Sequence, residues 1–208
     1  MLENGISTSS EAPHQLLHVG CGQLRPERIP ACFQTSQWQE IRFDIDPEVK
    51  PDIIGSITDL NAIESGSIDA IWSSHNLEHL NSYEVPIALA EFKRVLKLNG
   101  FVLLSVPNLR AVAQHIANDQ LSTILYQSAA GPITALDIVF GHQASQASGN
   151  HFMAHRTGFT SSTLGQLLLD AGFDEVRVHE GQHWDLWAIA TMPYTSPELF
   201  NDLAGVLQ

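Results

Sequence analysis

The chain has few basic residues. Lysine and arginine together number 10, against 23 aspartates and glutamates, and the net charge at pH 7 is −13. Proteins that bind nucleic acids or acidic membrane surfaces need clustered cations, and no run of lysine and arginine occurs in this sequence. The composition therefore argues against both kinds of partner.

Cysteines and long apolar runs are also scarce. Cys21 and Cys32 are the two cysteines, and neither their number nor their spacing predicts a disulfide framework or a zinc site. No stretch reaches the roughly 18 consecutive apolar residues of a membrane-spanning helix. Residues 1–15 lack the basic and then apolar pattern of a signal peptide. We therefore expect a cytoplasmic protein with a flexible tail over residues 1–14.

What the chain does contain is enough apolar sequence for one core. A protein of 208 residues buries about 70% of its unfolded surface, so we expect a single domain over residues 15–195 and a C-terminal tail over 196–208. Short, continuous apolar segments alternate with helical patterns, as in parallel sheets that are buried on both faces. The predicted strands are 15–19, 40–43, 52–54, 68–73 and 101–106.

Two helices can also be placed from apolar spacing. Val85, Leu89, Phe92 and Leu96 share one helix face, and Asn99-Gly100 predicts the end of that helix. A second amphipathic helix starts near Ser161. Two strands follow it at 175–179 and 184–191, and the four residues between them permit only an antiparallel pair. The fold class is therefore α/β, a Rossmann-like doubly wound sheet, mostly parallel with the last strand antiparallel.

The first predicted strand ends in a glycine turn at Gly20 and Gly22. Glycine tolerates positive φ and lets backbone approach a ligand closely. The second strand ends at Asp44, where a carboxylate can accept hydrogen bonds from both hydroxyls of a ribose, and Ile45 offers an apolar face to a base. The alternative is an Asx turn before Pro47. The order and separation of the turn and the acid favour a nucleotide site.

Five segments in order resemble one known family. They read Leu-Leu-His-Val-Gly-Cys-Gly, Phe-Asp-Ile-Asp-Pro, Gly-Ser-Ile-Thr-Asp-Leu, Ser-Ile-Asp-Ala-Ile-Trp-Ser-Ser-His-Asn-Leu-Glu-His-Leu and Glu-Phe-Lys-Arg-Val-Leu-Lys-Leu-Asn-Gly-Phe. Together they resemble class I S-adenosylmethionine-dependent methyltransferases, closest to the small type-11 group. The resemblance covers 16–107 and resumes over 155–173. It implies a seven-stranded sheet with the final strand antiparallel, and S-adenosylmethionine as cofactor.

The resemblance also implies positions for the cofactor-binding residues. Those expected under the methionine part or near the sulfonium are Gly20, Gly22, Ser74 and His75; those expected at the ribose and adenine are Asp44, Ile45, Ser56 and Ile57. The chain departs from the family pattern twice. His18, which we also expect to contribute to cofactor binding, stands where an acid usually precedes the glycine turn, and Ser56 stands where an acid commonly receives the adenine amino group.

Histidines are the candidate catalytic residues. Methyl transfer mainly requires alignment and exclusion of water, and a base is needed only when the acceptor loses a proton, which suits histidine near neutral pH. His75, at the end of the fourth strand, is the best-placed candidate, and His155 could reach the site from a lid. His79 is more readily explained as a packing or capping residue, and a solvated loop position is the alternative for every candidate.

A metal site is not expected. His75 and His79, like His151 and His155, are four residues apart, a spacing that would place two imidazoles on one helix face. That spacing is common by chance, and no third ligand is evident in the sequence.

Residues 109–154 are longer than the core sheet requires, and we expect them to form a lid that selects the substrate. The pattern predicts one helix, interrupted near residues 118–119, followed by a loop over 141–150. The aromatic and methionine side chains of this segment would either line the site or only pack the insertion onto the core. They are Tyr126, Phe140, Phe152 and Met153.

The sequence thus predicts methyl transfer to a small-molecule acceptor. A non-catalytic binding or scaffold protein with the same fold is one alternative. A nicotinamide-dependent oxidoreductase is less favoured, because the turn lacks the third glycine of the dinucleotide fingerprint and because Pro26 and Pro30 disfavour a long helix after it. The oligomeric state stays open.

Overall fold

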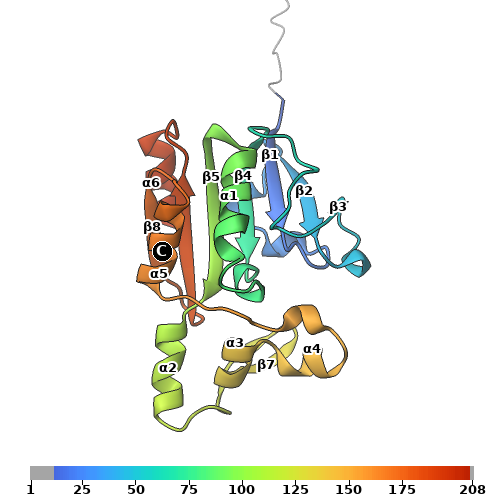
Figure 1. The fold of residues 1–208 in the computed structure, drawn as a ribbon, viewed down its shortest axis with the longest axis vertical. Helices are drawn as coiled ribbons and strands as arrows, with labels where there is room; N and C mark the ends of the chain where they lie inside the picture. Colours follow the sequence, from blue (N-terminus) through green and yellow to red (C-terminus); the bar gives the residue numbers. More distant parts are fainter. Residues whose placement is uncertain (1–11, 207–208) are drawn as a thin grey trace, which may run out of the picture.

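A computed structural model describes residues 12–206 of the chain. Its centre is a seven-stranded sheet in the order β3-β2-β1-β4-β5-β9-β8 (Figure 1). β9 runs antiparallel to both of its neighbours, whereas the other paired strands are parallel. The predicted sheet, with its last strand antiparallel, is confirmed. Its strands are β1 (His14–Val19), β2 (Trp38–Asp44), β3 (Ile53–Ile54), β4 (Ile68–Ser74), β5 (Leu96–Pro107), β8 (Val176–Glu180) and β9 (Asp185–Thr191).

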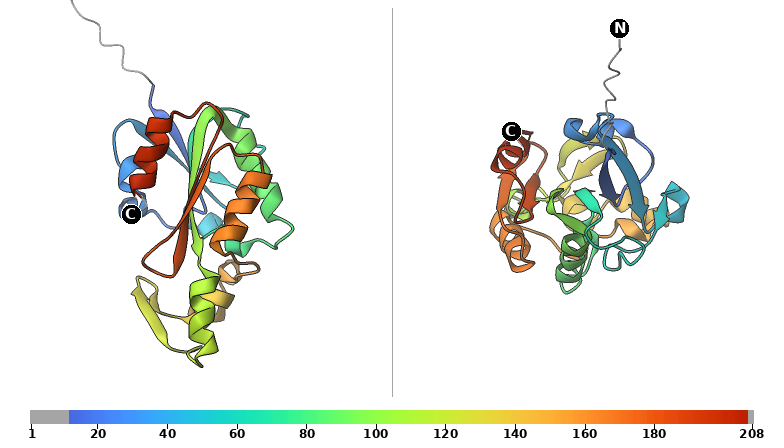
Figure 2. Two further views of the ribbon diagram at one scale, coloured as in Figure 1. Left: turned by 90° about the vertical axis from the view of Figure 1, so that its left-hand side faces the viewer. Right: turned by 90° about the horizontal axis from the view of Figure 1, so that it is seen from above.

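Helices cover both faces of this sheet (Figure 2). α1 (Val85–Val95) and α5 (Ser161–Asp170) lie on one face, where their apolar side chains join the main core. α6 (Pro197–Val206) lies on the other face. No helix in residues 12–206 is long and apolar enough to cross a membrane. The continuous apolar strands are thus buried from both sides, which is the reason for their lack of alternation.

The two chain ends differ from the predicted tails. Most of the N-terminal tail predicted over 1–14 lies outside the described residues, but His14 already belongs to β1. The C-terminal tail predicted over 196–208 is wrong, because α6 occupies most of it. Phe200 and Leu203, three residues apart, share one helix face and pack on the sheet beside Ile189. Tertiary burial stabilises a helix that the short local pattern did not predict.

The predicted end of the first helix is also wrong. α1 ends at Val95, the backbone of Leu96 is already extended, and Gly100 lies inside β5. A Cβ atom on Gly100 would lie 2.9 Å from the carbonyl oxygen of Asp69. This glycine therefore permits a close approach between β4 and β5 rather than a helix cap.

The connections near the glycine turn contain only short 3-10 helices. β1 and β2 are joined by η1 (Pro26–Arg28) and η2 (Ala31–Phe33), η3 (Pro47–Val49) follows β2, and η4 (Leu77–His79) follows β4. Pro26 is the first residue of η1, and Pro30 immediately precedes η2. The two prolines thus divide a connection that contains a long helix in dinucleotide-binding folds.

Residues 109–154 form a separate layer below the carboxyl ends of the strands (Figure 1). They contain α2 (Leu109–Ala117), the hairpin of β6 (Ile124–Ser128) and β7 (Gly131–Thr134), α3 (Ala135–Phe140), α4 (Gln143–Ala147) and η5 (His151–Met153). The predicted helix ends near residue 118 as expected, but Tyr126 lies in a strand, and the predicted loop over 141–150 contains α4. Pairing with β7 decides this conformation, since Ile133 of that strand anchors a small apolar core of the insertion.

Candidate active site

Three adjoining cavities lie between the sheet and the insertion, and Met153 lines all of them. We name each by a residue that lines it. The Asp44 cavity has a volume of about 290 Å³, the Cys21 cavity about 330 Å³ and the histidine cavity about 250 Å³. They connect the ends of strands β1, β2 and β4 with the insertion, so one continuous site spans both layers.

The Asp44 cavity contains five of the predicted cofactor residues: Gly20, Asp44, Ile45, Ser56 and Ile57. The carboxylate of Asp44, 8% exposed, accepts hydrogen bonds from the backbone nitrogens of Gly22 at 2.8 Å and Asp46 at 2.9 Å, one on each oxygen. The second contact is the Asx turn of the alternative interpretation. Each oxygen keeps a second lone pair, so the turn leaves the carboxylate able to accept two further donors.

Gly20 allows the close packing that a ligand site of this kind requires. Its φ is +64°, and a Cβ atom would lie 2.6 Å from Cγ of Asn76. The amide nitrogen of Asn76 is buried without a hydrogen-bond partner among residues 12–206, and this side chain lines the same cavity. An unpaired buried donor suits a ligand oxygen. Asn76 was missed in the sequence, where only its place directly after His75 could have indicated it.

The Cys21 cavity contains four more of the predicted residues: His18, Gly22, Ser74 and His75. His18 occupies the position that usually holds an acid, but a carboxylate lies beside it. Its Nδ1 donates to the carboxylate of Glu40 at 2.6 Å. The guanidinium of Arg42 donates to the carbonyl oxygen of Gly22. The neighbouring strand β2 thus supplies a carboxylate and a cation beneath the glycine turn, and sequence reasoning missed both.

Cys21 is an unreactive thiol in this setting. Burial raises its pKa from 9.0 to about 11, and the nearby charge of Arg42 offsets only part of that effect. Because the thiolate is the nucleophile, we expect iodoacetamide to alkylate Cys21 at pH 8 about 100-fold more slowly than an ordinary thiol, with a rate that rises about tenfold per pH unit up to pH 10.

Mass spectrometry of the Cys32→Ser variant, which leaves Cys21 as the only cysteine, measures this rate. S-adenosylhomocysteine should slow the reaction further if it occupies the Cys21 cavity. A rate that stops rising by pH 9 would show that the thiol is not perturbed in this way.

The histidine cavity is lined by five histidines from three parts of the chain: His75, His79, His142, His155 and His183. His75 also lines the Cys21 cavity, and its backbone is left-handed, with φ +48°. Its Nδ1 lies 3.3 Å from Oε1 of Glu78. Non-glycine residues in this conformation are uncommon, and the strain directs this imidazole to the place where two cavities meet.

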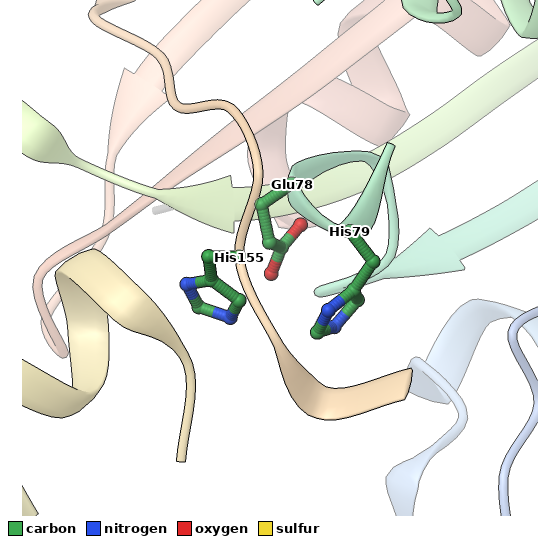
Figure 3. A group of neighbouring side chains, drawn as sticks. All are labelled: Glu78, His79 and His155. Carbon is green, nitrogen blue, oxygen red and sulfur yellow. The ribbon is translucent and has the colours of Figure 1, made fainter. Parts of the chain in front are cut away.

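Glu78 is a fully buried carboxylate among histidines (Figure 3). Burial raises its pKa, but the contact with His75 and the charges of the surrounding histidines outweigh that effect and hold the pKa below its usual value. Burial lowers the pKa of His155. The site therefore places one buried carboxylate beside three imidazoles, and burial and the charge of Glu78 shift the pKa of His155 in opposite directions. Glu78 was not among the predicted site residues.

The insertion contributes unequally to these cavities. Tyr126 lines the histidine cavity, Phe152 lines the Asp44 cavity, and Phe140 lies outside all three with 56% of its surface exposed. The two histidine pairs with a spacing of four do not lie on helix faces, because η4 and η5 are single 3-10 turns. Instead, the rings of His79 and His155 meet across the site, 4.9 Å between centroids.

Comparison with solved structures relates the fold to methyltransferases. An S-adenosylmethionine-dependent methyltransferase from Archaeoglobus fulgidus superposes with a TM-score of 0.57 at 16% identity, over 86% of each chain. A second from Methanosarcina mazei has a TM-score of 0.58 at 18% identity, over 88% of this chain and 93% of its own.

A third similar structure is the 1,6-didemethyltoxoflavin-N1-methyltransferase of Burkholderia thailandensis, with 1,6-didemethyltoxoflavin and S-adenosylhomocysteine bound. Its TM-score is 0.51 at 15% identity, over 86% of this chain and 72% of its own. At these identities the likeness concerns the fold. A search of curated protein sequences found no significant match.

Sequence comparison identifies the part of the chain that carries the resemblance. Residues 17–104 match the family model of a methyltransferase domain, the type-11 group. The matched segment runs from β1 into β5 and includes the glycine turn, Asp44 and His75. Residues 17–104 therefore match methyltransferase domains of the type-11 group, and this match together with the fold indicates a class I enzyme with S-adenosylmethionine as cofactor.

Proposed function

We propose that this protein transfers a methyl group from S-adenosylmethionine to a small-molecule acceptor bound in the histidine cavity. The observation that carries the proposal is the position of His75, which lines both the Cys21 cavity and the histidine cavity. A methyl group must pass between donor and acceptor in direct contact. His79 and Met153 also line the histidine cavity and a cofactor cavity, but His75 is the one that directly follows β4, and we place the transfer beside it.

The residues of the Asp44 and Cys21 cavities fit the cofactor. The free lone pairs of Asp44 would accept the two ribose hydroxyls, and Ile45, 48% exposed beside it, would cover one face of the adenine. The unpaired amide of Asn76 would donate to an oxygen of the amino-acid part. S-adenosylmethionine supplies an already activated methyl group when bound, so these residues have only to hold it in place and exclude water.

The histidine cavity fits a small, polar acceptor. Its volume of about 250 Å³ is smaller than that of most ligand pockets, which span about 300–1,000 Å³. The rings of Tyr126 and Trp184 line it in a stacked pair, 6.0 Å between centroids. The five histidines and Asp137 supply donors and acceptors. A net charge of −13 disfavours a nucleic-acid acceptor. The Burkholderia methyltransferase, whose fold is similar, has 1,6-didemethyltoxoflavin bound.

Of the two predicted catalytic histidines, His75 is favoured for direct contact with the reacting groups. Of the three cavities, His155 lines only the histidine cavity. Its Nδ1 donates to the carbonyl oxygen of Ile138 at 2.8 Å. This contact holds the ring against α3. We therefore assign His155 to the acceptor side of the site, and His75 to the boundary between the Cys21 cavity and the histidine cavity.

Calorimetry with S-adenosylmethionine, S-adenosylhomocysteine and NAD tests the cofactor half of this proposal. We expect both adenosyl compounds to bind one per chain and NAD not to bind. Binding of NAD alone would indicate an oxidoreductase, and binding of none of the three would indicate a scaffold protein with this fold.

The acceptor half requires a turnover assay. Release of S-adenosylhomocysteine is measured with a panel of small hydroxylated, carboxylated and nitrogen-heterocyclic compounds, and with RNA and protein substrates for comparison. The proposal expects turnover with a small compound that also protects the histidine cavity from modification by diethyl pyrocarbonate. Turnover only with a macromolecule would overturn it.

A further inference from the structure

We propose that Glu78, His79 and His155 form a binding site for one divalent transition-metal ion. The two histidines are 76 positions apart in the chain, yet one ligand atom from each of the three residues lies within 4.8 Å of the other two (Figure 3). Glu78 and His79 belong to η4, and His155 follows η5 in the returning chain. A carboxylate and two imidazoles from two segments are a set that binds such ions in many proteins.

The backbone already fixes both imidazoles in the form that binds metals. Nδ1 of His79 lies 3.1 Å from the carbonyl oxygen of Ala154, and Nδ1 of His155 lies 2.8 Å from that of Ile138. A carbonyl oxygen can only accept, so each Nδ1 carries a proton, and in the neutral form of each ring it is Nε2 that has the lone pair. In metal sites, a hydrogen bond from the ring nitrogen that does not bind the ion orients each histidine and sets its tautomer.

The carboxylate of Glu78 is the independent observation that points to a cation. Its side chain is fully buried, and neither oxygen has a well-aligned hydrogen bond within residues 12–206. Acceptor positions that are buried and unfilled in this way are stabilised by a nearby cation. His75 approaches one oxygen at 3.3 Å, and a carboxylate has a second oxygen that can bind an ion.

The donor set and its surroundings indicate the class of ion. Imidazole nitrogens favour Mn²⁺, Fe²⁺, Co²⁺ or Zn²⁺ over Mg²⁺ and Ca²⁺, which prefer oxygen ligands. Ligands about 2.1 Å from an ion lie about 3–3.5 Å apart, so each pair of ligand atoms needs to approach by about 1.8 Å at most. One negative charge among two neutral rings leaves a bound divalent ion with net positive charge.

Such an ion would face the acceptor. His79 and His155 line the histidine cavity while Glu78 lies buried behind them, so the remaining coordination positions open toward that cavity. We infer that an acceptor with a hydroxyl or carboxylate oxygen completes the coordination, which would lower the pKa of a bound hydroxyl. This second step rests on the proposed function; the metal site itself does not.

Metal titration of the full-length protein tests the site without any turnover assay. The protein is treated with a chelator, and Co²⁺, Mn²⁺ and Mg²⁺ are then titrated separately by calorimetry, with visible absorption as a second measurement for Co²⁺. We expect one Co²⁺ or Mn²⁺ per chain and much weaker binding of Mg²⁺.

The decisive variants are His155→Asn and Glu78→Gln, with His151→Asn as the matched control. An asparagine at 155 keeps a donor near the position of Nδ1 but lacks Nε2. We expect it to lower the Co²⁺ affinity at least 100-fold, since replacing even a residue that only hydrogen-bonds to a metal ligand lowers metal affinity about 10–100-fold. His151 lies in the same segment, is exposed, and lines none of the three cavities, so its variant should bind Co²⁺ like the natural protein.

Equal Co²⁺ affinity in the His155→Asn variant and the control would overturn the metal site. S-adenosylhomocysteine binding, expected to be unchanged within about threefold, shows that each variant is folded; if Glu78→Gln does not fold, His155→Asn decides. A protein that binds Co²⁺ through these residues but binds no adenosyl compound would retain the metal site and contradict the proposed function.

Discussion

Replacing Asp44 with alanine should abolish measurable binding of S-adenosylhomocysteine while the chain stays folded. The substitution removes an acceptor for two hydroxyl donors, and hydrogen bonds to charged groups contribute about 1.5–3 kcal/mol each. Together they correspond to a loss of at least about 100-fold in affinity. Calorimetry measures the affinity, and thermal unfolding followed by circular dichroism measures the stability.

Two further variants make this result specific. Asp46→Ala removes the neighbouring carboxylate, which among the described residues accepts only from the backbone nitrogen of Glu48. Asp46 lies outside the three cavities, so this variant should bind S-adenosylhomocysteine with unchanged affinity. Asp44→Asn keeps the side-chain shape and one acceptor oxygen, and should have intermediate affinity. If Asp44→Ala retains the natural affinity, or if Asp46→Ala loses as much, the assignment of Asp44 to the ribose is wrong.

Replacing His75 with asparagine should lower turnover about 100-fold or more while S-adenosylhomocysteine affinity changes by less than about threefold. Displacing a group at the point of transfer by about 1 Å can cost two orders of magnitude in rate. His75 is one of several residues that line the Cys21 cavity, so its loss should affect cofactor affinity less. Asparagine is chosen because it tolerates the left-handed backbone, φ +48°, better than alanine.

Steady-state kinetics with the acceptor found in the panel separates kcat from KM, and calorimetry gives the cofactor affinity. His14→Asn is the control, since His14 lies at the opposite end of β1 and contacts Asp69 there. A fall in cofactor affinity as large as the fall in kcat would make His75 a cofactor-binding residue instead.

That the residues proposed for the cofactor lie together could be predicted from the sequence, because the determinants of their positions are local. The strands that carry Gly20, Asp44 and Ser74 were each predicted from their own apolar runs. Parallel strands place their carboxyl ends along one edge of a sheet. Knowledge of where each strand ends was therefore enough to bring these residues together.

The acceptor half could not be predicted in the same way. Glu78 in the sequence is one acid in a short helical segment, and nothing local shows that it is fully buried or that residue 155 returns beside it. The expectation of no metal rested on the absence of a third ligand near either histidine pair. The proposed site instead takes one histidine from each pair, and His155 comes close to Glu78 and His79 only because η4 and the segment after η5 pack together.

The sequence by itself determined the positions of the main strands, the glycine turn and the acid at the end of β2. Hydrophobic periodicity and the turn preferences of single residues act within a few positions of the chain. Only the tertiary structure decided the hairpin of the insertion, the helix α6 and the meeting of Glu78, His79 and His155. Each depends on burial against residues distant in the chain, and that free energy has no counterpart in the local pattern.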